Sequence, residues 1–129
     1  MAKNMKLKAA RIAETKDRRP RACAKYIRIS PYKVRVVLDL VRGKKVNEAV
    51  AILENCSKAG AEPIKKVVLS AAANAENNLG MNKDDLKVAV AYADQGPTLK
   101  RMRPMAHGRA FRILKRTSHI TIILDAMAK

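Results

Sequence analysis

Residues 97–119 carry seven Lys or Arg and two His but no Asp or Glu. They lie between two stretches that alternate as β-strands do, DLKVAVAYAD before them and ITIILD after them. Two such strands can pair antiparallel through the segment that joins them. Because the joining segment holds no acid to neutralise its charge, it cannot be buried within its own protein. It therefore needs a polyanion as its partner.

The charge of the whole chain is large and unevenly distributed. Its 28 Lys and Arg against 11 Asp and Glu give a formal net charge of +17 over 129 residues. Residues 1–29 contain ten basic and two acidic residues, whereas residues 46–95 contain five basic and seven acidic ones. This distribution predicts a nearly neutral folded middle with basic ends. Nucleic acid is the favoured partner, and an anionic membrane surface is the alternative.

Several other classes of protein are not favoured. No stretch is long and apolar enough to span a bilayer, and the N-terminus lacks the apolar run of a signal peptide. Cys23 and Cys56 are far apart and are predicted to be free thiols of a reducing cytosol, not metal ligands. We expect no cofactor and no small-molecule substrate. The few aromatic residues argue against reading single-stranded RNA by base stacking.

The pattern of apolar residues predicts an α+β protein. Strands are expected at 22–29, 86–93 and 120–124, and helices at about 31–42, 47–55 and 62–79. Ser30 and Asn47 are predicted to cap the first two helices, and Gly43 and Gly80 to end the first and third. The expected architecture is three helices packed on a small three-stranded antiparallel sheet, with a long protruding β-hairpin.

The expected organisation has four parts. Residues 1–21 form a basic N-terminal extension that is disordered unless bound, and residues 22–125 form one globular domain. Within that domain, residues 97–118 form the extended hairpin arm, and residues 126–129 are a tail.

The hairpin is predicted to turn at 104–108, where its middle holds Pro and Gly. Each arm would then have roughly ten residues and project on the order of 30 Å at about 3.3 Å per residue. Its cations can point to both faces, which indicates a ribbon enclosed by nucleic acid; a solvated basic loop is the alternative. The predicted RNA-binding residues of the arm and of the strand after it are Lys100, Arg101, Arg103, Arg109, Arg112, Lys115, Arg116 and His119. Those of the N-terminal part are Arg18, Arg19, Arg21, Lys25, Arg28, Lys33 and Arg35.

His107 and His119 could in principle act as the general base and acid of a ribonuclease. One lies near the predicted tip and the other at the base of the hairpin, and no carboxylate lies nearby to orient either ring. We therefore predict that the chain is not an enzyme. His119 is expected to contact phosphate or to cap the edge of the sheet.

Three segments resemble one family, large-ribosomal-subunit protein twenty-two of the bacterial type. The run GPTLKRMRPMAHGRAFRILKRTSHITIIL resembles its hairpin and final strand. ISPYKVRVVLDLVRGKKVNEAVAIL resembles its first helices, and AEPIKKVVLSAAANAENN resembles its long helix. The similarity extends from about Ala22 to Leu124, and the combination of GPTLKR with RILKRTSHIT is highly specific.

The resemblance implies a structural protein of the cytoplasmic ribosome that binds 23S rRNA and supports early assembly of the large subunit. The globular part would lie near the mouth of the peptide exit tunnel, beside neighbouring ribosomal proteins. The hairpin would line the tunnel wall near the macrolide site and the nascent peptide. Its tunnel-facing tip would comprise Met102, Pro104, Met105 and His107. Met105 and His107 stand where the family commonly has basic residues, so this tip is less cationic. A free architectural nucleic-acid-binding protein is the alternative.

Overall fold

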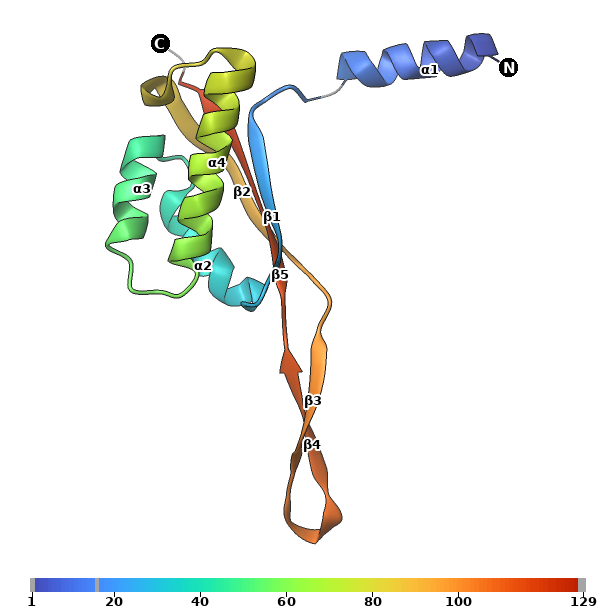
Figure 1. The fold of residues 1–129 in the computed structure, drawn as a ribbon, viewed down its shortest axis with the longest axis vertical. Coiled ribbons are helices and arrows are strands. Elements are labelled where there is room, and N and C mark those ends of the chain that lie inside the picture. Colours follow the sequence, from blue (N-terminus) through green and yellow to red (C-terminus); the bar gives the residue numbers. More distant parts are fainter. Residues whose placement is uncertain (1, 16, 128–129) are drawn as a thin grey trace.

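The computed structural model describes residues 2–15 and 17–127, and it confirms the α+β class. Three helices cover one face of a sheet from whose end a thin β-hairpin projects (Figure 1). The helices are α1 (Ala2–Thr15), α2 (Pro31–Val41), α3 (Val46–Glu54) and α4 (Ala61–Leu79). The strands are β1 (Arg21–Ile27), β2 (Leu86–Gln95), β3 (Leu99–Pro104), β4 (Ala110–Lys115) and β5 (Ser118–Ala126). Two short 3₁₀ helices are η1 (Lys83–Asp85) and η2 (Ala106–Gly108).

The main sheet is antiparallel with the order β1-β5-β2, so the last strand lies in the centre. The expected pairing of the strands on either side of the hairpin is confirmed, because β2 pairs with β5 along its length. Alternate residues of β5 are fully buried beneath the helices: Ile120, Ile122 and Leu124. The residues between them point to the opposite face of the sheet. This alternation of the two faces is the strand pattern that the sequence showed.

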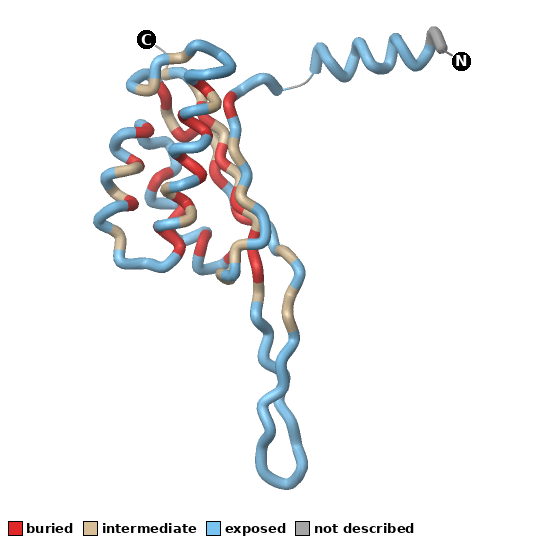
Figure 2. Tube along the Cα trace, viewed as in Figure 1, coloured by how far each residue is buried: buried red, intermediate tan, exposed pale blue. Residues whose placement is uncertain are grey.

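The core lies between this sheet and helices α2, α3 and α4, and Figure 2 shows the buried residues concentrated there. Helix α2 buries one stripe at the predicted spacing: Val34, Val37, Leu38 and Val41. The buried face of α4 includes Ala71, Ala72 and Ala75, whose small side chains let the helix approach the sheet closely. Gly80 ends α4 in the left-handed conformation, as predicted.

The predicted caps of the first two core helices are only partly correct. Ser30 is the N-cap residue of α2 and Pro31 opens the helix, as predicted, but the Ser30 side chain makes no capping hydrogen bond. Helix α3 begins at Val46, and its cap position is Lys45, not Asn47. The reason is tertiary. The turn after α2 pairs with β2 through Gly43 N–H to Val88 O (2.8 Å) and Val88 N–H to Lys44 O (2.9 Å), which fixes where α3 starts.

The N-terminal extension was predicted to lack regular structure, and that prediction is wrong for Ala2–Thr15, which form α1. Alanine and lysine, which are abundant there, have high helix propensity, and this local preference outweighs the weak periodicity of the segment. At the other end, Ala126 of the predicted tail is the last residue of β5, and residues 128–129 lie outside the described part.

Candidate nucleic-acid interface

Strands β3 and β4 form a separate two-stranded antiparallel ribbon beyond the main sheet. The chain reverses at η2, where His107 and Gly108 both have positive φ (58° and 68°), and Met105 N–H bonds Arg109 O at 2.8 Å. The predicted turning point is therefore confirmed. Six residues of each strand are paired, which corresponds to about 20 Å of ribbon.

The ribbon has no core of its own. Every residue from 100 to 115 is exposed, and Figure 2 shows the hairpin coloured as exposed over this length. The exposed fractions of Phe111 and Met102 are 61% and 64%. A two-stranded ribbon without a second layer is marginally stable in water. Its exposed apolar and basic side chains are therefore free to contact another molecule, and such contact would stabilise the ribbon.

The register of the ribbon places each of its paired cations opposite an apolar residue. Lys115 faces Leu99, Arg112 faces Met102, and the same holds for Lys100, Arg101 and Arg103 against Leu114, Ile113 and Phe111. Like charges directly opposite each other would destabilise the ribbon, and this register avoids every such pair. The aliphatic part of each basic side chain can instead cover its apolar neighbour.

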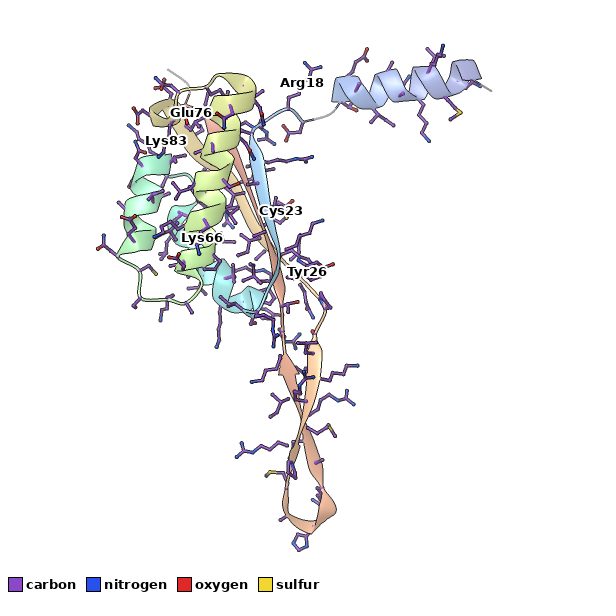
Figure 3. All side chains as sticks on the ribbon, viewed as in Figure 1. Arg18, Cys23, Tyr26, Lys66, Glu76 and Lys83 are labelled. Atoms are coloured by element: carbon purple, nitrogen blue, oxygen red, sulfur yellow. The ribbon has the colours of Figure 1, made fainter. Side chains whose placement is uncertain are left out.

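Cations lie on both faces of the ribbon, as strand alternation requires. Arg101, Arg103 and Lys115 belong to one face, and Lys100 and Arg112 belong to the other. Side chains project to both sides of the hairpin in Figure 3. None of the ion pairs between described residues involves the hairpin, so its guanidinium and ammonium groups are available to an external anion.

The base of the hairpin is fixed by a small set of contacts that the sequence reasoning missed. Gly96 N–H donates to Thr117 O (2.9 Å), and Thr117 Oγ1 donates to Pro97 O (2.7 Å). A Cβ on Gly96 would lie 2.5 Å from Thr117 Oγ1, so any larger residue would force the Thr117 side chain to move. Thr117 and Ser118 are buried although both are polar. The Gly-Pro pair at 96–97 could have predicted this junction, because Gly-Pro pairs commonly mark a turn or loop between two strands.

His119 lies in β5 at the same junction, where it accepts a hydrogen bond from the Tyr26 backbone N–H through Nδ1 (3.0 Å). Tyr26 forms a bulge of the edge strand β1, and Figure 3 places it at the level where the hairpin leaves the sheet. His107 lies in the turn at the tip, so all of β4 separates the two imidazoles. The structure therefore does not bring them together as an acid–base pair.

No group of three or more potential metal ligands occurs among the described residues.

The other predicted RNA-binding residues are on the body. Arg18, Arg21, Lys25, Arg28 and Lys33 are exposed. Arg19 is paired with Asp17 at 2.6 Å, and hydrogen bonds from the Arg19 side chain and backbone lower the pKa of Asp17 to about 2.

Arg35 has a structural partner. Its guanidinium donates to Ala93 O (2.9 and 3.1 Å) and lies 5.5 Å from the Tyr32 ring centroid. Arg42 likewise donates to Ala91 O at 2.8 Å. The two side chains bind carbonyls of the edge strand β2, so they protect that edge from pairing with another strand.

Comparison of the sequence with known proteins identifies a family. The family model described as "Ribosomal protein L22p/L17e" matches residues 22–125. The "Large ribosomal subunit protein uL22" of Clostridium novyi (strain NT) is 58% identical over 108 residues, which are 84% of this chain and 97% of that relative. Within the described residues, no helix has the length and apolarity needed to cross a membrane.

These matches decide between the alternatives left open by charge. A free architectural nucleic-acid-binding protein is not supported, since both matches are to ribosomal proteins over most of the chain. The chain belongs to the ribosomal protein L22p/L17e family and is a non-enzymatic structural constituent of the large ribosomal subunit.

Proposed function

We propose that the chain binds 23S rRNA through cations on both faces of the β3–β4 hairpin, and that this binding supports early assembly of the subunit. The observation that carries the proposal is a fully exposed ribbon with cations on both faces and no acidic residue. RNA phosphates neutralise such a ribbon on both sides at once, whereas a flat anionic surface reaches only one face.

The proposal extends to the position of the protein in the particle. The globular body lies near the mouth of the peptide exit tunnel, against neighbouring ribosomal proteins. The hairpin lines the tunnel wall, with Met102, Pro104, Met105 and His107 towards the lumen and the nascent peptide. The exposed thioethers of Met102 and Met105 support this assignment, because Met adapts its shape to varied apolar partners.

The salt dependence of binding to a 23S rRNA transcript tests the RNA interface. With six or more phosphate contacts, the slope of log K against log salt should be about −4 or steeper. Arg101 and Arg112 lie on opposite faces, so R101Q/R112Q should reduce the magnitude of the slope by about 1.4 to 1.8. K58Q/K83Q, in the nearly neutral middle, is the matched control and should leave the slope unchanged.

A wild-type slope near −1 would contradict the proposal, because the basic residues would not be in contact with phosphate. The tunnel position has a separate test in intact particles. Crosslinkers placed at residue 105 should capture both 23S rRNA and stalled nascent chains, and capture of neither would refute that position.

A further inference from the structure

Helix α1 lies outside the part of the chain that the family comparison explains. The family match begins at residue 22, after α1 has ended at Thr15. The Clostridium relative is matched over 97% of its own length by 84% of this chain. The role of α1 therefore has to be read from its own residues.

The helix has an apolar stripe bordered by basic residues. Met5, Ala9 and Ile12 follow at i, i+4 and i+7, so they lie on one face. Lys6 and Lys8 flank this stripe on its two sides, each within about 60° of it at 100° per residue. The stripe is shallow, because Ala9 lies between its two larger side chains.

Nothing in the described structure covers this stripe. Met5 and Ile12 have exposed fractions of 72% and 57%, and every described side chain of α1 is exposed. The helix stands apart from the helices and sheet of the body (Figure 1). No ion pair between described residues involves its basic side chains. A 14-residue helix is marginally stable alone in water, so contact with a partner would stabilise α1.

The charges and the composition of the stripe identify the partner. A second copy of this chain, with its net charge of +17, would repel α1. Membrane-surface helices carry Trp, Phe or Leu on the apolar face, whereas this stripe has only Met5 and Ile12 as large residues. Nucleic acid supplies the missing negative charge, and its sugars offer a surface against which a shallow stripe can pack.

The helix is also continuous with other basic residues. Arg18 and Arg21 follow α1 directly and are exposed, and Arg18 lies between the helix and β1 in Figure 3. Pro20 is buried, and its carbonyl accepts a hydrogen bond from Leu124 N–H (2.9 Å), so the chain is anchored to β5 just before β1. If an RNA helix binds Arg18 and Arg21, α1 is close enough along the chain to contact the same RNA helix.

We propose that α1 binds a double-helical segment of rRNA across its minor groove, as a second RNA contact independent of the hairpin. Double-helical RNA has a wide, shallow minor groove lined by sugars, whereas its major groove is too narrow for a helix. The stripe of Met5, Ala9 and Ile12 packs on the riboses, and Lys6 and Lys8 reach phosphates of the two opposite strands. This inference rests on the proposed function, because it requires that the partner be ribosomal RNA.

The test uses the full chain with the 23S rRNA transcript and measures affinity, salt slope and ribose protection from hydroxyl radicals. K6Q/K8Q retains helix propensity, because Gln is nearly as good a helix former as Lys. It should lower affinity about five- to tenfold and reduce the magnitude of the salt slope by about 1.4 to 1.8, in line with two lost phosphate contacts. It should also abolish one patch of ribose protection while sparing the patch that R101Q/R112Q removes.

Unchanged affinity and protection in K6Q/K8Q would overturn the role of α1 and leave the hairpin proposal standing if R101Q/R112Q still weakens binding. Failure of the wild-type chain to bind the transcript would instead overturn the proposed function itself. Vesicles of anionic phospholipid provide a second arm. Vesicle binding that M5S/I12S abolishes, together with rRNA affinity that K6Q/K8Q does not change, would assign α1 to membranes and refute the RNA assignment.

Discussion

The backbone N–H of Tyr26 donates a 3.0 Å hydrogen bond to Nδ1 of His119, 93 residues further along the chain. Tyr26 has a positive φ of 59°, and its ring meets the imidazole edge to face at 4.9 Å. Because Nδ1 is the acceptor, the neutral imidazole carries its proton on Nε2. The contact joins the bulge of β1 to the central strand at the point where the hairpin begins.

Replacing His119 with Ala should destabilise the body by about 0.5–1.5 kcal/mol, because the Tyr26 N–H exchanges its acceptor for water and the strained bulge loses its support. Urea denaturation followed by circular dichroism measures this loss. The matched control is His107→Asn, at the exposed tip, since Asn tolerates a positive φ. Equal stability of the two variants would show that the Tyr26–His119 contact does not hold the bulge.

Gly96→Ala should cost about 1–3 kcal/mol, because the new methyl group would overlap the buried Thr117 side chain and crowd the His119 ring. Gly60→Ala is the comparison. The added Cβ there would lie 3.7 Å from Val37 Cγ2, an ordinary contact, and Gly60 has a negative φ of −73°. Thermal unfolding should show a lower Tm for the first variant only. A normal Tm in Gly96→Ala would mean that the hairpin base adapts without cost.

The Asp17 carboxyl should titrate near pH 2 in the free protein, since Arg19 lowers its pKa from the ordinary 3.8 to about 2. Its pairing therefore stabilises the segment above pH 3.8, and that contribution is lost as the pH falls through about 2. Carbon-detected NMR of the carboxyl resonance measures the midpoint. In Arg19→Gln the midpoint should rise towards 3.8, and an unchanged midpoint would exclude the guanidinium as the cause.

Shortening the hairpin should leave the body folded. Lys100 and Leu114 are cross-strand partners, so residues 101–113 can be replaced by Asn-Gly, which closes a two-residue turn. No residue of that stretch belongs to the core, so Tm should change by no more than about 4 °C. Affinity for 23S rRNA should fall sharply. Loss of cooperative unfolding would show that the arm contributes to the fold of the body.

Local patterns in the sequence determined most of the elements. The stripe of Val34, Val37, Leu38 and Val41 predicted α2, and the alternation from Leu86 to Tyr92 predicted β2. Both signals depend only on neighbours a few residues away, which is why they survive without tertiary information. The position of the hairpin and its turn also followed from the acid-free run and its single Pro-Gly region.

The tertiary structure decided what depends on residues distant in the chain. Three features arise only when distant segments meet. They are the register that sets Arg101 opposite Ile113, the hydrogen bond from Arg35 to the β2 edge, and the contact between Tyr26 and His119. Alternation along one strand gives the face of each side chain but not its partner, because sliding the other strand by two residues preserves the pattern. The pairing of β1 and β2 with β5, and of β3 with β4, removes that freedom and fixes which charges remain exposed.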